Sequence, residues 1–137
     1  MIRFTVPGQP QGKGRARFST AGKFARAYTP AKTVAYEGLI ALAAQDVMLD
    51  RPLIEGPVYL HVTATFPIPA SWSKRRKAEI ASGCAWHTSK PDGDNIAKSV
   101  GDGLNGIVFK DDSQVALTKI LKIYGDKPGL DIMVEAL

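Results

Sequence analysis

Apolar and polar residues alternate in two stretches of the chain, and this pattern predicts two half-buried strands. Every second residue is apolar in residues 2–6 and again in residues 57–66. Successive side chains of a strand point to opposite faces, so each stretch would bury one face and expose the other. Two more strands are predicted at residues 115–124 and 130–136, joined as a hairpin by the turn-rich segment between them. The alternation slips near Lys119, which predicts a bulge there.

Helical spacing predicts a long helix after the first strand. Between residues 36 and 47 the apolar positions recur three or four residues apart, which indicates a helix from about Pro30 to Leu49. Thr29 is expected to be the N-cap and Pro30 the first helical residue, where its fixed φ angle is favourable.

Two further helices are predicted downstream. Residues 73–81 are basic and begin at Ser73, a good capping residue, which indicates a short helix. Residues 94–104 read as a second long helix that opens on an acidic motif. Gly101 and Gly103 argue against this helix, because each costs about 1 kcal/mol relative to alanine in a helix interior.

The order of these elements predicts the fold class. Residues 1–137 are expected to form a single small α+β domain, with a mixed or antiparallel sheet of about four strands and two main helices on one face. Residues 7–29 are rich in Gly, Pro, Arg, Lys and Ser without an apolar period, so they are expected to be a long flexible loop or a ragged hairpin. A loop of this length in a compact domain is more often functional than not.

Composition is that of an ordinary globular protein. The chain has 137 residues, of which 45% are hydrophobic and 23% charged. No apolar run approaches the roughly 20 residues that span a bilayer, and the N-terminus lacks the apolar region of a signal peptide. Cys84 is the single cysteine, which excludes a disulfide framework. We therefore expect a cytoplasmic protein without a membrane partner.

Charge is distributed unevenly along the chain. The net charge is +5, and the first 36 residues hold seven Lys or Arg and no acid. Five of the thirteen acids lie between residues 92 and 112. A basic protein that concentrates its carboxylates in one segment is expected to hold metal ions against a polyanion such as nucleic acid.

The spacing of these acids suggests which of them act together. Asp92 and Asp94 are two residues apart, so in an extended segment both carboxylates face the same way. In a helix that starts near Asp94, Lys98 and Asp102 follow on the same face. Asp111 and Asp112 lie in the turn before a predicted strand, and folding can bring one of them to the first pair. Oxygen ligands of this kind suit Mg²⁺, with Mn²⁺ as a substitute.

A purely structural role for the same residues stays open. Asp92 and Asp94 would then cap a helix, Lys98 would pair with Asp102, and the turn at residues 111–112 would simply be solvated. Five clustered acids repel one another, however, unless a cation is bound.

Other metal and phosphate motifs are incomplete. The segment at Lys13 is not a P-loop, because Pro7 stands at the first glycine position and Gly14 replaces the required Ser or Thr. Cys84 and His87 have a zinc-like spacing, but the sequence has no second pair.

Basic residues are predicted to contact DNA in two segments. In residues 7–29 they alternate with aromatic residues, an arrangement suited to the phosphate backbone and to unstacked bases. The second segment is the short basic helix, which on its own is also typical of a solvated surface. The predicted DNA contacts are Lys13, Arg15, Arg17, Lys23, Arg26, Lys74, Arg75 and Arg76.

The acidic motif resembles a known family. It reads Lys-Pro-Asp-x-Asp-Asn-Ile-x-Lys from Lys90 to Lys98, continues through Asp102 and Asn105-Gly106, and ends in Asp-Asp-x-Gln-Val from Asp111. This pattern resembles the signature of the RusA-type Holliday junction resolvases. The similarity extends to the N-terminal Pro-Gly-Gln-Pro-x-Gly-Lys-Gly-Arg segment and to Trp72-Ser73-Lys74, so it spans nearly the whole chain. Gly93 and the glycines beside Asp102 depart from the larger residues expected there.

The resemblance implies a function and a set of roles. Members of the family are small homodimeric, Mg²⁺-dependent endonucleases of bacteria and their prophages that cut four-way or branched DNA. It implies that Asp92, Asp94 and Asp112 are catalytic metal ligands and that Lys98 is a catalytic lysine. Asp102, Asp111 and Asn95 would contact the metal ligands rather than the metal itself. Two other hypotheses stay open: a non-catalytic or inactivated DNA-binding protein, and a metal-dependent enzyme acting on a nucleotide sugar.

Overall fold

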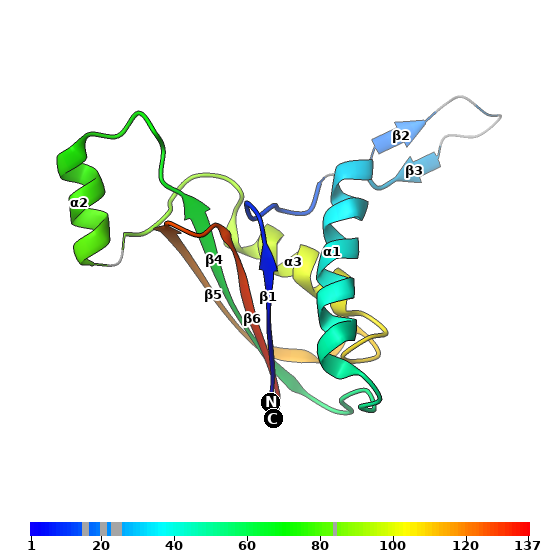
Figure 1. Ribbon diagram of the computed structural model, residues 1–137. Coiled ribbons are helices and arrows are strands. Elements are labelled where there is room, and N and C mark those ends of the chain that lie inside the picture. Colours follow the sequence, from blue (N-terminus) through cyan, green and yellow to red (C-terminus); the bar gives the residue numbers. More distant parts are fainter. Residues whose placement is uncertain (15–16, 20–21, 23–25, 84) are drawn as a thin grey trace.

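The structure, a computed structural model, describes residues 1–14, 17–19, 22, 26–83 and 85–137. These ranges form one α+β domain in which a four-stranded mixed sheet is accompanied by a two-stranded sheet and three α-helices (Figure 1). The elements are β1 (Ile2–Pro7), β2 (Arg17–Ser19), β3 (Arg26–Tyr28), α1 (Ala31–Met48), β4 (Val58–Pro67), α2 (Lys74–Ser82), α3 (Gly93–Leu104), the 3₁₀ helix η1 (Asp112–Gln114), β5 (Val115–Gly125) and β6 (Gly129–Ala136).

The main sheet has the strand order β1-β6-β4-β5, and this order overturns the predicted C-terminal hairpin. β4 is parallel to β5 and antiparallel to β6, so it lies between the two strands that were expected to pair. β4 and β6 are the two inner strands, so β4 is paired along both edges and β5 lies at an edge of the sheet. The sheet is therefore mixed, and of the two predicted forms, mixed or antiparallel, the first is confirmed.

The predicted bulge exists, but it lies at a different residue. Val58 pairs with Val115 while the next residue, Tyr59, pairs with Leu117, so Ala116 is the extra residue. From Leu117 onward the pairing runs without a shift through Lys119, where the bulge was expected. The slip in the apolar pattern thus reflects an edge strand with one open face rather than an inserted residue at Lys119.

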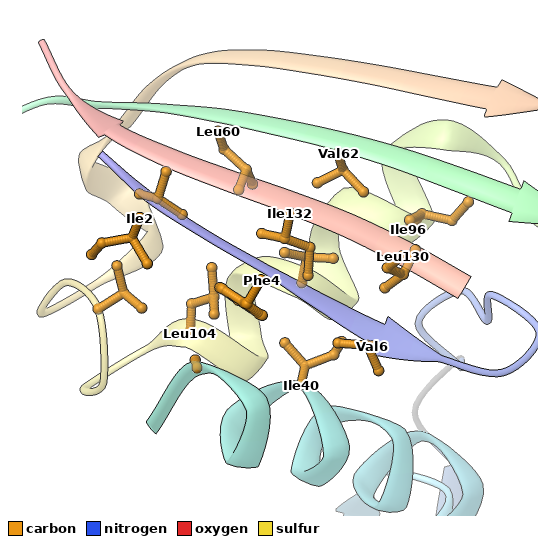
Figure 2. Packing of buried hydrophobic residues seen from close by; sticks show 14 of the residues in the cluster. Ile2, Phe4, Val6, Ile40, Leu60, Val62, Ile96, Leu104, Leu130 and Ile132 are labelled. Carbon is orange, nitrogen blue, oxygen red and sulfur yellow. The ribbon is translucent and has the colours of Figure 1, made fainter. Parts of the chain in front are cut away.

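The two longest helices cover one face of the main sheet, as predicted. Alternate residues of β4 are buried, and they meet buried side chains of β1, β6, α1 and α3 in one hydrophobic core (Figure 2). From α1 the core takes Tyr36, Ile40, Ala44 and Met48, and from α3 it takes Ile96, Val100 and Leu104. None of the helices in the described ranges combines the length and apolar character needed to cross a membrane.

Helix boundaries agree with the predictions except at the start of α1. Pro30, not Thr29, is its N-cap residue, and no side chain caps this helix. The carbonyl oxygen of Pro30 accepts the first helical bonds from Thr33 and Val34, which moves the helix start one residue along. In α2 the hydroxyl of Ser73 accepts a bond from the backbone nitrogen of Arg76, as expected for its cap.

Segments rich in basic residues lie on two different sides of the molecule. β2 and β3 pair antiparallel and project beyond the N-terminal end of α1, so this described part of residues 7–29 agrees with the ragged hairpin rather than the loop (Figure 1). α2 lies on the opposite side, beyond the end of β4 (Figure 1). The site that carries the acids therefore lies between two basic extensions.

Candidate active site

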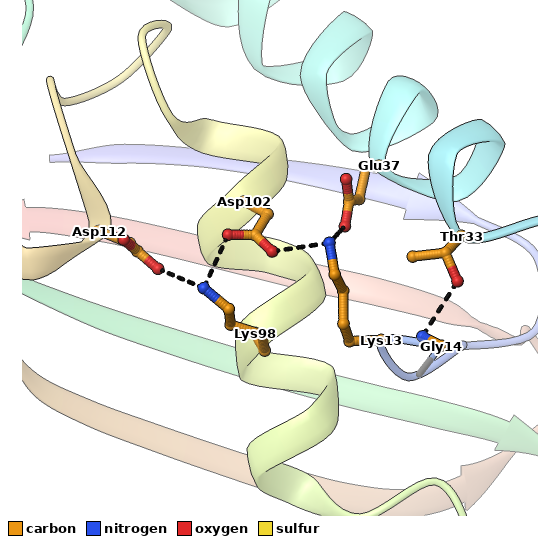
Figure 3. Close-up of polar contacts among 7 residues, drawn as sticks. All are labelled: Lys13, Gly14, Thr33, Glu37, Lys98, Asp102 and Asp112. Carbon is orange, nitrogen blue, oxygen red and sulfur yellow. Dashed lines mark hydrogen bonds and ion pairs between the residues drawn. The ribbon is translucent and has the colours of Figure 1, made fainter. Parts of the chain in front are cut away.

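α3 presents three charged residues in one row. Asp94, Lys98 and Asp102 follow at intervals of four on the side of the helix away from its buried apolar residues. The amine of Lys98 lies 3.0 Å from Asp102 Oδ1 and 3.2 Å from Asp112 Oδ2, so it joins α3 to η1 (Figure 3). The structure thus brings Asp112 to Lys98 in the middle of α3, whereas the predicted approach to Asp92 and Asp94 stays a prediction.

A glycine and a helix cap allow Asp112 to come this close. A Cβ atom on Gly101 would stand 3.3 Å from the Cβ of Asp112, so the bare backbone of α3 leaves room for η1. Asp111 caps η1: its side chain accepts a bond from the Ser113 backbone, and Gln114 closes a reciprocal capping box. Gln114 also donates to the carbonyl oxygens of Ile54 and Gly56, which ties η1 to the loop before β4.

Asp92 and Asp94 lie at the N-terminus of α3. Asp92 is the N-cap residue by position, but its side chain makes no capping bond. Asp94 Oδ1 accepts a bond from the Asn95 backbone at 3.1 Å, and the side chains of all three residues are exposed. Exposed carboxylates at a helix N-terminus suit the positive end of the helix dipole, and their oxygen atoms are the ligands that hard divalent cations prefer.

Suitable ligand atoms form a metal site only where folding brings their side chains together. Within the described ranges, no group of three or more His, Cys, Asp or Glu side chains gathers closely enough to hold a metal ion. The three-residue ligand set of Asp92, Asp94 and Asp112 therefore stays a prediction. The supporting role of Asn95 also stays a prediction. Its backbone carbonyl oxygen accepts a bond from the backbone nitrogen of Lys13.

Lys13 enters the site from the segment that follows β1. Its amine lies 2.6 Å from Glu37 Oε1 on α1 and 2.9 Å from Asp102 Oδ2 on α3 (Figure 3). Glu37 was not among the predicted site residues. Its signal in the sequence is slight: it is the first acid of the chain and follows seven basic residues.

The ion pairs shift the pKa values of the groups involved. Burial acts to raise the pKa of Asp102, but hydrogen bonds from Lys13 and Lys98 outweigh it and hold the pKa below 3.8. Burial acts to lower the pKa of Lys13, but the hydrogen bonds that its amine donates to Glu37 and Asp102 raise it overall. Bonds to Asp102 and Asp112 raise the pKa of Lys98. All three groups are therefore charged at neutral pH.

A cavity of about 690 Å³ adjoins the acidic helix. It lies between the segment after β1, the start of α1 and the start of α3, and it opens beside Asp92 and Asn95. Lys32 and Lys90 contribute positive charge to its lining. A hollow of this size beside exposed carboxylates can receive part of an anionic substrate.

The predicted DNA contacts are found in several environments. Lys74, Arg75 and Arg76 are exposed on α2, and the guanidinium of Arg76 stacks 3.6 Å above the ring of Trp72. Trp72 in turn meets Tyr124 edge-on at 4.6 Å, which fixes this end of α2 to β5. Arg26 is exposed in β3, and Arg17 lies in β2. Arg15 and Lys23 lie outside the described residues.

His87 belongs to the core side of the molecule. Its ring stacks on Phe66 at 3.6 Å and also meets Tyr124, and burial together with Lys122 lowers its pKa. A buried ring stacked in this way has a structural role in packing rather than a place among the charged residues of α3.

The fold and the site define a class: a small α+β domain whose exposed carboxylates and paired lysine lie between basic extensions. Residues 7–135 match the family described as Endodeoxyribonuclease RusA, and the chain belongs to this family. It is also similar to a Bacillus subtilis (strain 168) protein named "Uncharacterized protein YqaN". The two are 38% identical over 138 residues, which cover 98% of this chain and 95% of that protein.

Proposed function

We propose that this chain is a Mg²⁺-dependent endonuclease that resolves Holliday junctions and other branched DNA by phosphodiester hydrolysis. Membership of an endodeoxyribonuclease family supports cleavage of DNA as its general activity. The observation that carries the proposal is the convergence on Lys98: α3 supplies Asp94, Lys98 and Asp102 in one row, and η1 adds Asp112 at 3.2 Å from the lysine amine. A DNA substrate implies that the protein acts in the bacterial cytoplasm, whether its gene belongs to the bacterium or to a prophage.

Each charged residue of the candidate site has a role in the proposed reaction. The exposed carboxylates of Asp92 and Asp94, with Asp112, would hold the Mg²⁺ ion, and Mn²⁺ would substitute for it. The bound ion supplies an activated water and neutralises charge on the phosphate. Lys98, whose amine lies 3.2 Å from Asp112, would stabilise the negative charge that develops during attack. Asp102 holds that amine at 3.0 Å on the side away from Asp112.

The basic extensions would bind the DNA backbone. Residues on the β2–β3 hairpin and on α2 lie on two sides of the acidic site, which suits a substrate whose arms leave the branch point in different directions (Figure 1). Phosphate contacts from such residues position a duplex without reading its sequence. This arrangement therefore favours recognition of DNA shape over recognition of base sequence.

We further propose that the protein acts as a homodimer, so that one assembly carries two sites for the two strands to be cut. The outer side of α1 supports this state, since it exposes Val34, Leu39, Leu42 and Leu49. Lys32 lies near one end of this surface and Asp46 near the other. Two antiparallel copies of α1 would bring these opposite charges together and cover the apolar residues between them.

A synthetic four-way junction tests the proposed activity. The wild type is expected to cut it when Mg²⁺ is added and to leave it intact with EDTA. Asp94→Asn should reduce the rate at least about a hundredfold while junction binding persists. Asp126→Asn, in the exposed connection between β5 and β6, removes the same charge away from the site and should cut normally. Binding without cleavage by the wild type, indifferent to Mg²⁺, would instead establish a non-catalytic DNA-binding protein.

A further inference from the structure

Lys13 is held in a way that is unusual for a lysine expected to contact DNA. Its amine bonds two carboxylates from two different helices, Glu37 at 2.6 Å and Asp102 at 2.9 Å. The side chain of Lys13 is 25% exposed, and those of Glu37 and Asp102 are 19% and 18% exposed. An amine neutralised by two largely buried carboxylates has little charge left to offer to a phosphate.

The backbone around Lys13 is fixed as well. Its nitrogen donates to the carbonyl oxygen of Asn95 at 3.1 Å, and the nitrogen of Gly14 donates to Thr33 Oγ1 at 3.0 Å. A Cβ atom on Gly12 would stand 2.8 Å from the Cβ of Pro91, so the segment is seated closely against the loop before α3. Residues 12–14 therefore join the start of α1 to the start of α3, and this fixed backbone leads the side chain of Lys13 toward Glu37 and Asp102.

Asp102 links this arrangement to the candidate active site. One of its oxygens receives Lys13, and the other receives Lys98, which in turn reaches Asp112 (Figure 3). Charges of opposite sign thus alternate from α1 across α3 to η1. We call this series the ion-pair chain; its members are Glu37, Lys13, Asp102, Lys98 and Asp112.

We propose that Lys13 and Glu37 are positioning residues for DNA cleavage, acting through Asp102 on the amine of Lys98; this inference rests on the proposed function. The side chain of Lys98 is 53% exposed and has a long flexible stem, so packing alone does not hold it. Asp102 can fix it only while its own carboxylate is held, and Lys13 holds the other oxygen. Glu37 keeps Lys13 in place from the opposite side.

Single-turnover cleavage of a four-way junction at saturating protein separates positioning from binding. Glu37→Gln and Lys13→Met are expected to slow the chemical step about tenfold to a hundredfold, because misplaced groups lose catalytic alignment. Their dissociation constants for the junction should stay within about twofold of the wild-type value, and Lys13→Arg should recover part of the rate. Glu135→Gln and Lys127→Met make the same charge changes at exposed positions and should leave the rate unchanged.

A second readout does not depend on cleavage. In ¹⁵N-labelled wild-type protein, the ammonium group of Lys98 should give an NMR signal protected from exchange with water, and Glu37→Gln should weaken that protection. Glu37→Gln preserves side-chain size, so it tests the idea even if Lys13→Met does not fold. A wild-type rate in Glu37→Gln with unchanged Lys98 protection would overturn the inference, as would a Lys13→Met variant that loses only junction affinity. An inactive wild type would contradict the proposed function, and the NMR comparison would still decide the role of Lys13.

Discussion

Gly103 of α3 lies directly against Ile40 of α1: a Cβ atom on Gly103 would stand 2.8 Å from Cγ2 of Ile40 and 3.2 Å from the carbonyl oxygen of Glu37. The two helices therefore approach each other more closely at this point than any larger residue would allow. Because Glu37 and Asp102 flank the same contact, the approach also sets the gap that the amine of Lys13 bridges.

Gly103→Ala is expected to destabilise the protein although alanine is the better helix former. The added methyl group meets a buried side chain and a carbonyl oxygen, and overpacking of this kind costs about 1–3 kcal/mol. Gly38→Ala provides the matched control, since Gly38 also lies inside a helix but has nothing within 4 Å of its would-be Cβ. That variant should gain about 0.5–1 kcal/mol, measured by urea unfolding. Equal effects of the two substitutions would contradict the close contact.

The charge on Asp102 should make a pH-dependent contribution to stability. Its pKa is lowered in the folded protein, so the stabilisation is complete above the unfolded value of about 3.9 and is lost as the pH falls through the folded pKa. Asp102→Asn is expected to cost about 1–3 kcal/mol at pH 7, because two lysines lose their partner. The difference from the wild type, followed by urea unfolding in EDTA, should shrink below about pH 4. A gap that persists at low pH would indicate a packing effect instead.

Asp111 and Asp112 are neighbours with different expected roles. Asp111→Ala removes the cap of η1 and should cost about 1 kcal/mol of stability, seen in thermal or urea unfolding. Its effect on junction cleavage should be far smaller than that of Asp112→Ala, which removes the partner of Lys98 and the predicted ligand. Comparable losses of activity in the two variants would place Asp111 in the catalytic machinery.

Two neighbouring arginines of α2 allow DNA contact to be separated from packing. Arg75→Ala and Arg76→Ala each remove one positive charge, and each should reduce the salt dependence of junction affinity by about one unit of slope if both contact phosphates. Only Arg76 stacks on Trp72, so only its removal should also loosen α2. Hydrogen exchange of the α2 amides would report that loosening, and unchanged affinity in both variants would remove α2 from the DNA surface.

The outer side of α1 gives a direct test of the homodimer. Leu42→Lys places a charge in the middle of its exposed apolar residues and should convert a dimer into a monomer in light scattering after size exclusion. Leu117→Lys makes the same change on the edge strand β5, where the side chain is 50% exposed, and should leave the dimer intact. Dissociation by Leu117→Lys alone would move the interface to the sheet edge.

Much of the architecture was predictable from local pattern. The alternation in β1 and β4 and the spacing in α1 identified these elements because each buries one side in the same core. Strand order was not predictable in this way. Whether β6 pairs with β5 or with β4 depends on contacts between segments far apart in the sequence, and neighbouring strands in sequence are only usually neighbours in space.

The candidate site was predictable in part for a related reason. Helical spacing placed Lys98 beside Asp102, because both belong to one local element. Helix propensity alone was misleading, because Gly101 and Gly103 argued against a helix that exists. Gly101 lies where Asp112 approaches α3, and Gly103 lies where Ile40 approaches it. Glu37 could not be found from spacing, because its relation to Lys13 and Asp102 exists only once α1 and α3 have packed.

The pairing of β1 with β6 has a consequence for the synthesis of the protein. Among the described strands β1 comes first in the sequence and its neighbour in the sheet, β6, comes last, and β6 connects β1 to β4. A growing chain on the ribosome therefore cannot close its sheet until residues 129–136 have emerged. Contacts that span the whole chain also fold slowly. The acidic helix consequently receives the complete support of the sheet only after residues 129–136 have been made, although its own residues are made earlier.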